Sequence, residues 1–282
     1  MPLSNPCQRG RWIRIAVRRG SIAFACAAAL LIGDAGVVRA DSMALWKIVH
    51  AQCVPNYAST GRPDPCAAVW PDAAVLKDIV GVAQFLLIAT TRVDGIESPS
   101  LLAAGAPNYW DAAWQARKFL TERLHTTLPR DAIGLAINSA AARTQDQLHI
   151  HIDCVREDVT KTLNEHQAEI GPSWATVSIP PGRSYLVRRL EHDTLAHRDP
   201  FELVAAQGPD ARDNMGMQTI AVIGAVFENG TPGFYVLSHR ADVAACDPGA
   251  AEELLDHDCH VATHPRPESS PRSDQHPKQP ID

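Results

Sequence analysis

The stretch of this 282-residue chain with the clearest potential for chemistry is Gln-Leu-His-Ile-His-Ile-Asp, residues 147–153. Apolar and polar residues alternate through it, and such alternation is typical of a β-strand because successive side chains point to opposite faces. One face of the predicted strand is apolar. The other carries Gln147, His149, His151 and Asp153, and we expect this polar face to lie outside the core.

Three interpretations of the two histidines are open. As metal ligands they need at least one further donor, and no Cys or His stands nearby at the spacing of structural zinc sites. As plain polar residues they would lie on an exposed strand. As a catalytic pair, the neutral imidazole of one would attack phosphorus while other groups bind the phosphate oxygens. Gln147, His151 and Thr144 are hydrogen-bond donors suited to that second task.

The elements around this strand predict an α+β fold. Apolar runs at 73–79 and 84–90 flank a short Gly-containing turn and predict a hairpin, and helical spacing from Pro107 to Leu124 predicts a long helix. A strand, a polar loop and the 147–153 strand follow. A short helix at 43–52, ended near Pro55, precedes them. The second half repeats the order of elements and ends in a hairpin around Asn229-Gly230, which suggests a degenerate duplication of one antiparallel sheet with flanking helices.

The two ends of the chain differ from its body. Residues 1–40 contain six Arg and one Asp before and around an apolar run, which predicts an export signal or a membrane anchor. We therefore expect the body, residues 41–260, in the periplasm or on the periplasmic face of the inner membrane. Residues 261–282 are rich in Pro, Ser and charge and predict a disordered tail. The net charge of −6, with this basic leader included, makes nucleic acid an improbable partner.

Export to an oxidising compartment lets cysteines pair. Cys53 and Cys66 flank a Pro- and Gly-containing loop, and Cys246 and Cys259 bracket an acidic segment, so we predict these two local disulfides. Cys154, on the apolar face of the central strand, is predicted to be a buried free thiol.

Several segments together resemble a known family. Residues 147–153 resemble the histidine-triad motif with Gln147 in the first His position, and the hairpin 75–93 and the loop 137–144 resemble the segments before that motif. Within this superfamily the stretches 44–56, 86–102, 107–117 and 136–152 resemble CDP-diacylglycerol pyrophosphatases. The resemblance covers roughly residues 43 to 245.

The resemblance implies a histidine-triad-like hydrolase that splits CDP-diacylglycerol in the membrane into CMP and phosphatidate without a cofactor or metal. His149 would form a cytidylyl-phosphohistidine. His151 would support phosphate binding, its carbonyl orienting His149, and Gln147 would act as a neutral donor in the catalytic group. The remaining expected substrate contacts are Asp78 at the ribose, Asn138 and Thr144 near the phosphates, and Lys77 and Arg143 as basic residues.

Roles without substrate contact remain open for these residues: Asp78 could lie in a turn, Asn138 could cap a loop, and Lys77 and Arg143 could be solvated surface charges. Gln84 replaces another family histidine. The alternative functions are a hydrolase or transferase on soluble nucleotides and a non-enzymatic periplasmic metal-binding protein. The oligomeric state is not indicated by the sequence.

Overall fold

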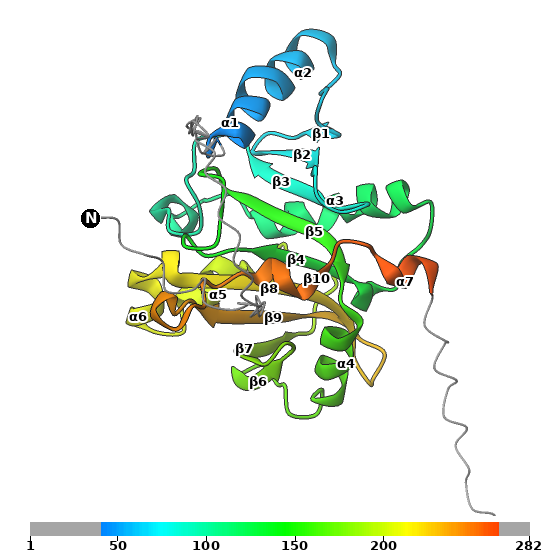
Figure 1. Ribbon diagram of the computed structural model, residues 1–282, viewed down its shortest axis with the longest axis vertical. Coiled ribbons are helices and arrows are strands. Elements are labelled where there is room, and N and C mark those ends of the chain that lie inside the picture. The colour runs from blue at the N-terminus through cyan, green and yellow to red at the C-terminus, as the bar shows by residue number, and fades with distance from the viewer. Residues whose placement is uncertain (1–40, 265–282) are drawn as a thin grey trace, which may run out of the picture.

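The computed structural model describes residues 41–264, and its centre is one antiparallel sheet of ten strands (Figure 1). The strand order is β1-β2-β3-β5-β4-β8-β9-β7-β6, and β10 pairs with the far end of β5. The strands are β1 (Ala68–Val69), β2 (Ala73–Lys77), β3 (Phe85–Ala89), β4 (Ile133–Ile137), β5 (His149–Val155), β6 (Ala175–Ile179), β7 (Arg183–Leu190), β8 (Gln218–Val226), β9 (Pro232–Arg240) and β10 (Leu255–Asp256).

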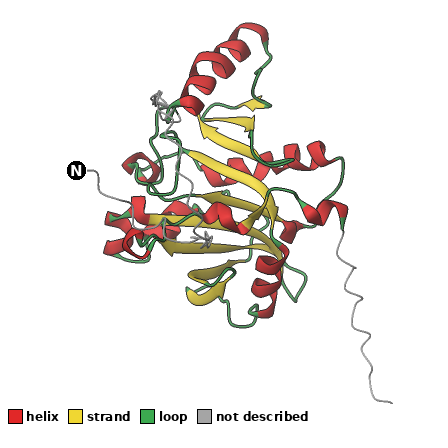
Figure 2. Cartoon of the chain, viewed as in Figure 1, coloured by secondary structure: helices red, strands yellow, loops and turns green. Residues whose placement is uncertain are grey.

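Helices cover both faces of this sheet (Figure 2). The α-helices are α1 (Ala44–Ile48), α2 (Val54–Thr60), α3 (Tyr109–Leu124), α4 (Glu157–Glu165), α5 (Pro200–Ala205), α6 (Pro209–Asp213) and α7 (His260–Thr263). Shorter helical segments are η2 (Val49–Cys53), η3 (Pro99–Leu102), η4 (Arg130–Ala132), η5 (Met215–Met217), η6 (Val243–Ala245) and η7 (Ala251–Leu254). Within residues 41–264, no helix has both the length and the apolar character that a membrane crossing requires.

The α+β fold predicted from the sequence is confirmed, and the two halves of the sheet have the same strand order. In the first half the hairpin β2-β3 and the later strands give the order β2-β3-β5-β4. In the second half the order is β6-β7-β9-β8. The two halves meet at β4 and β8, which pair from Gly134↔Ile223 to Ile137↔Ile220.

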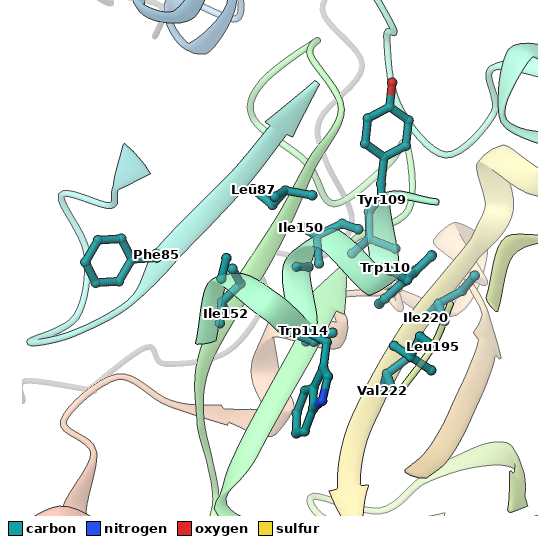
Figure 3. Packing of buried hydrophobic residues seen from close by; sticks show 14 of the residues in the cluster. Phe85, Leu87, Tyr109, Trp110, Trp114, Ile150, Ile152, Leu195, Ile220 and Val222 are labelled. Carbon is teal, nitrogen blue, oxygen red and sulfur yellow. The ribbon is translucent and has the colours of Figure 1, made fainter. Parts of the chain in front are cut away.

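The main hydrophobic core lies between the sheet and α3 (Figure 3). Ile150 and Ile152 of β5 point into it, as the alternation predicts, and meet Trp110 and Trp114 of α3. Asn108 caps α3 by accepting a hydrogen bond from the Asp111 N–H at 3.0 Å, so this helix begins where the sequence predicts. Phe201 of α5 and Val222 of β8 belong to the same core, which therefore joins both halves of the chain.

The opposite face of the sheet carries two smaller apolar clusters with β5 between them. One contains Leu86 and Ile88 of β3 and is covered by the N-terminal helix; the other contains Leu237 of β9 and is covered by α4 and η7. His149, His151 and Asp153 of β5 are on this face, and all three are buried. The sequence correctly predicts that these residues share the face opposite the main core, but the expectation that this face is exposed was wrong. The alternation of residues identifies a face and does not show which other segments cover it.

The N-terminal helix is longer than predicted. Pro55 does not end it: the π-helical segment η2 leads directly into α2, and Pro55 is the second residue of α2. The helix ends at Gly61, whose φ of 71° forms a left-handed cap.

The structure confirms one of the two predicted disulfides and corrects the other. Cys53 pairs with Cys66. Cys259 pairs with Cys154, not with Cys246, so Cys154 is no free thiol. The physical reason is that the chain after η7 returns to β5, where β10 lies against Cys154 and Val155, although these residues are about a hundred positions earlier in the sequence.

The last described segment passes from one face of the sheet to the other. Ala251 and Leu254 of η7 pack on the histidine-bearing face, β10 lies in the plane of the sheet, and Cys259 and Val261 join the core beside α3. In Figure 1 this segment is orange to red. Helix α7 includes residues that were assigned to the predicted tail; the rest of that tail and the predicted leader, residues 1–40, lie outside the described residues.

Candidate active site

The side chain of His149 is fixed by the backbone of its own strand. Its Nδ1 lies 2.7 Å from the carbonyl oxygen of Gln147, which can only accept, so the ring proton is on Nδ1 and the Nε2 lone pair is free. The sequence-based expectation that the His151 carbonyl orients this ring was wrong. Burial, and then the neighbouring His151, lower the pKa of His149 to about 4. At neutral pH the ring is uncharged, as a nucleophile must be.

His151 lies beside it, with the two ring centroids 5.1 Å apart. Gln84 donates from Nε2 to Asp78 Oδ2 at 2.7 Å and to His151 Nδ1 at 2.9 Å. Because the carboxylate can only accept, the amide orientation of Gln84 is determined, and the proton of His151 must be on Nε2. That Nε2 is buried and has no partner among the described residues. Burial lowers the pKa of His151, so the ring is neutral near neutral pH. Its Nε2–H can therefore donate a hydrogen bond to an acceptor outside the described residues.

A shallow recess opens at His149 and contains three of the other predicted site residues. It is lined by His149, Arg143, Asn138, Gln147, Gly95, Ile96, Ile137 and Leu148. Arg143 forms ion pairs with Glu97 at 2.5 Å and Asp146 at 3.3 Å. Burial lowers the pKa of its guanidinium, but the two acids outweigh this and raise it overall, so a cation stands beside the nucleophile candidate.

Gln147 has a structural task that the sequence did not indicate. Its amide nitrogen donates to the carbonyl oxygens of Ala89 at 2.8 Å and Thr91 at 2.7 Å, and its oxygen accepts from Arg92. Both amide hydrogens are therefore used to tie the end of β3 to β5. The side chain is fully buried, and in this arrangement it offers a phosphate no N–H.

The structure separates the other predicted substrate contacts. Asp78 is joined to His151 through Gln84. Lys77 lies at the β2-β3 turn, where its Nζ donates to the carbonyl oxygens of Asp78 and Gly81. Thr144 is exposed on the loop before β5.

Two residues that sequence reasoning missed complete the buried polar network. Glu252 of η7 accepts from Asn138 Nδ2 at 3.1 Å and lies 3.5 Å from His151 Nδ1, while its N–H donates to Asn138 Oδ1. His257 Nδ1 lies 2.9 Å from Asp153 Oδ2 and its Nε2 lies 3.7 Å from Glu252. Asn138 thus positions Glu252, and Asp153 positions His257.

The charges of this network differ between its members. The hydrogen bond to Asp153 raises the pKa of His257, whereas burial raises the pKa of Asp153. Burial also tends to raise the pKa of Glu252, but His151 and the hydrogen bond from Asn138 outweigh it and lower the pKa overall. Glu252 is therefore a carboxylate near neutral pH. The local signal for these residues was the acidic, His-containing stretch 252–260, which the sequence resemblance did not reach.

Fold and site together define an α+β protein with a neutral, backbone-oriented histidine beside an arginine and an unpartnered imidazole N–H. Comparisons with known proteins agree with this class. Residues 40–263 match the family model described as CDP-diacylglycerol pyrophosphatase. A protein of Yersinia pestis named CDP-diacylglycerol pyrophosphatase is 41% identical over 244 residues, which are 83% of this chain and 92% of that protein. The chain belongs to the CDP-diacylglycerol pyrophosphatase family.

Proposed function

We propose that this chain hydrolyses the pyrophosphate bond of CDP-diacylglycerol to CMP and phosphatidate, with His149 as the nucleophile. Family membership supports the substrate and the reaction. The observation that carries the mechanism is the neutral His149 ring, whose Nδ1–H is held by the Gln147 carbonyl so that the Nε2 lone pair is free, in a residue that lines the recess. The histidine-triad likeness of this part of the sheet belongs to the same proposal.

In the first step Nε2 of His149 attacks the cytidylyl phosphorus, an N–P bond forms, and the P–O bond to phosphatidate breaks. The imidazole becomes cationic, and the Gln147 carbonyl stabilises its Nδ1–H. We assign Arg143, which lines the recess, and the unpartnered Nε2–H of His151 to the non-bridging oxygens, where negative charge must be met in the transition state.

The neutral Gln147 in the first triad position is compatible with this step. Phosphatidate leaves as a phosphate monoester, whose second pKa is about 6, so the departing oxygen is a stable anion near neutral pH. Proton transfer to the leaving group is therefore a small requirement. Instead of a titratable group, Gln147 contributes hydrogen bonds that connect the end of β3 to the start of β5.

In the second step a water molecule attacks phosphorus, the N–P bond breaks and CMP leaves. A base must take the proton of the water. Glu252 is the candidate, because it is a carboxylate, is fixed by Asn138, and its side chain remains 27% exposed. The proton then passes to solvent, and His149 returns to its neutral form.

The alternative functions receive less support. The candidate metal-binding groups found within residues 41–264 are Asp153 with the disulfide-bonded Cys154 and Cys259, and the surface group Asp256, Asp258 and His260. Neither includes His149 or His151. A soluble nucleotide would fit the same chemistry, and only a direct comparison of substrates separates it from the lipid.

The test uses CDP-diacylglycerol labelled in the cytidylyl phosphate. After a rapid acid-free quench, the wild-type protein should carry the label on His149, and His149→Ala should carry none and release no CMP. His151→Ala should be slowed less. His166→Ala, an exposed histidine paired with Glu169, is the matched control and should behave as wild type. Full activity in His149→Ala overturns the mechanism, and preference for ADP-sugars or dinucleoside polyphosphates overturns the lipid assignment.

A further inference from the structure

The turn between β2 and β3 exposes three aliphatic side chains beside the part of the buried polar network that contains Asp78, Gln84 and His257. Ile79 is 100% exposed, Val82 49% and Val80 45%. Turns of this length are usually built from Gly, Asn, Asp and Ser, which satisfy the backbone and interact with water. A cluster of exposed aliphatic residues instead marks an interaction surface. We call Ile79, Val80 and Val82 the apolar tip.

The backbone of this turn is hydrogen-bonded within the protein. The N–H of Val80 donates to Asp78 Oδ1 at 3.2 Å, and the N–H of Val82 donates to the His257 carbonyl at 2.8 Å. Lys77 Nζ donates to the carbonyl oxygens of Asp78 at 2.6 Å, Gly81 at 2.9 Å and Val80 at 3.4 Å. Backbone groups left without hydrogen-bond partners are costly to bury in an apolar medium. The apolar tip can therefore leave water with these groups already paired.

The charges around the apolar tip fit an anionic surface. Lys77 holds the turn from one side, and Arg123 of α3 lies at the other, with its Nε 3.5 Å from the Val82 carbonyl. A cation close to an anionic bilayer surface is attracted to it. Two acids near the turn are withdrawn from solvent, since the Asp78 side chain is 13% exposed and Asp153 is fully buried, whereas Asp258 and Glu122 are exposed. The turn thus presents aliphatic groups outward, with the exposed cation Arg123 beside them.

The same turn is connected to the catalytic residues by two hydrogen bonds. Asp78, which begins it, accepts from Gln84, and Gln84 donates to His151. We propose that the apolar tip inserts into the surface of an anionic lipid bilayer and thereby brings the active site to a membrane-held substrate. This inference rests on the proposed function in one respect, that the substrate is a lipid.

The experiment compares two substrates on the full-length chain. One is long-chain CDP-diacylglycerol in vesicles of phosphatidylethanolamine and phosphatidylglycerol, and the other is a short-chain CDP-diacylglycerol below its micelle concentration. The triple variant Ile79→Ser/Val80→Ser/Val82→Ser should lose at least tenfold in kcat/KM on vesicles and keep its rate on the dissolved substrate. Val226→Ser/Val243→Ser removes two exposed valines elsewhere, each 53% exposed, and should match wild type on both substrates.

Each outcome is decisive. An equal loss on both substrates would assign the apolar tip to catalysis, and an unchanged rate on vesicles would exclude it from docking. A triple variant that keeps its vesicle rate but loses a dimer seen by size-exclusion chromatography would assign the tip to a contact between copies. Any membrane attachment through residues 1–40 is common to all variants. If the wild-type protein hydrolyses neither of the two substrates, the proposed function is refuted instead.

Discussion

Two neighbouring histidines on one strand face have received different tasks from their surroundings. His149 has its Nδ1–H held by a backbone carbonyl and its Nε2 free, whereas His151 accepts at Nδ1 and has its Nε2–H free. This difference fits the roles that we propose, nucleophile for His149 and hydrogen-bond donor for His151. The His-Ile-His spacing predicts that the rings share a face, but not this difference, because the tautomers depend on Gln147 and Gln84.

The burial of His149 predicts the acid limb of the pH profile. Burial and the adjacent His151 lower its pKa to about 4, and Nε2 can attack only while the ring is neutral. Protonation thus removes the nucleophile below about pH 4 and leaves it intact above. We expect kcat/KM of the free enzyme to fall on the acid side with a midpoint near this value. A midpoint near 6.5, the value of an exposed histidine, would contradict this assignment.

Glu252 supports a second prediction at this scale. If it takes the proton of the attacking water, Glu252→Gln should slow release of CMP by at least tenfold while phosphatidate is still released in the first turnover. Labelled enzyme should then accumulate. Glu253→Gln, which makes the same charge change at a residue paired with Arg183, is the control and should accumulate none. Equal slowing of both products in Glu252→Gln would assign Glu252 to positioning His151.

At the scale of elements, local patterns predicted the strands and helices well. The hairpin β2-β3, helix α3 and the hairpin β8-β9 follow from periodicity and turn residues within each segment. The closure of the site by η7 and β10 did not follow, because it depends on contacts between residues about a hundred positions apart, which leave no periodic trace. Glu252 and His257 were missed for this reason, as was the partner of Cys154.

The disulfide between Cys154 and Cys259 fixes this closing segment against β5. Its residues are 105 positions apart, and the chain-entropy model gives about 4.7 kcal/mol of stabilisation for a loop near that length. We expect Cys154→Ser/Cys259→Ser to lower both the melting temperature and the hydrolysis rate, because Glu252 and His257 lose their anchor. Cys53→Ser/Cys66→Ser, distant from the closing segment, should lower the melting temperature and preserve most of the rate. Equal effects of both variants on the rate would show that the closing segment needs no covalent anchor.

At the scale of the whole molecule, the two halves have the same strand order but different chemistry. The two histidines of the proposed site lie in the first half, and the second half supplies the other half of the sheet together with the closing segment. The sequence predicted the repeat from element order. It did not predict that one core crosses both halves, since which surfaces meet is decided by packing.

At Gly224 this shared core has no room for an added Cβ atom. A Cβ there would overlap the carbonyl of Arg130 and contact the ring of Trp114, both from the first half. Gly224→Ala should lower the free energy of unfolding by about 1–3 kcal/mol, the usual range for overpacking. Calorimetry should still show one transition. Gly171→Ala, where an added Cβ meets nothing within 4 Å, is the control, and two separate transitions in either protein would contradict a shared core.

The passage of the closing segment from one face of the sheet to the other also sets an order of events during synthesis. A nascent chain that has emerged to residue 245 already holds His149 and His151, yet Glu252, His257 and Cys259 are still in the ribosome. The complete site therefore forms only when nearly all of the described chain has been made. Products of premature termination near residue 245 would contain both histidines and lack Glu252, His257 and Cys259.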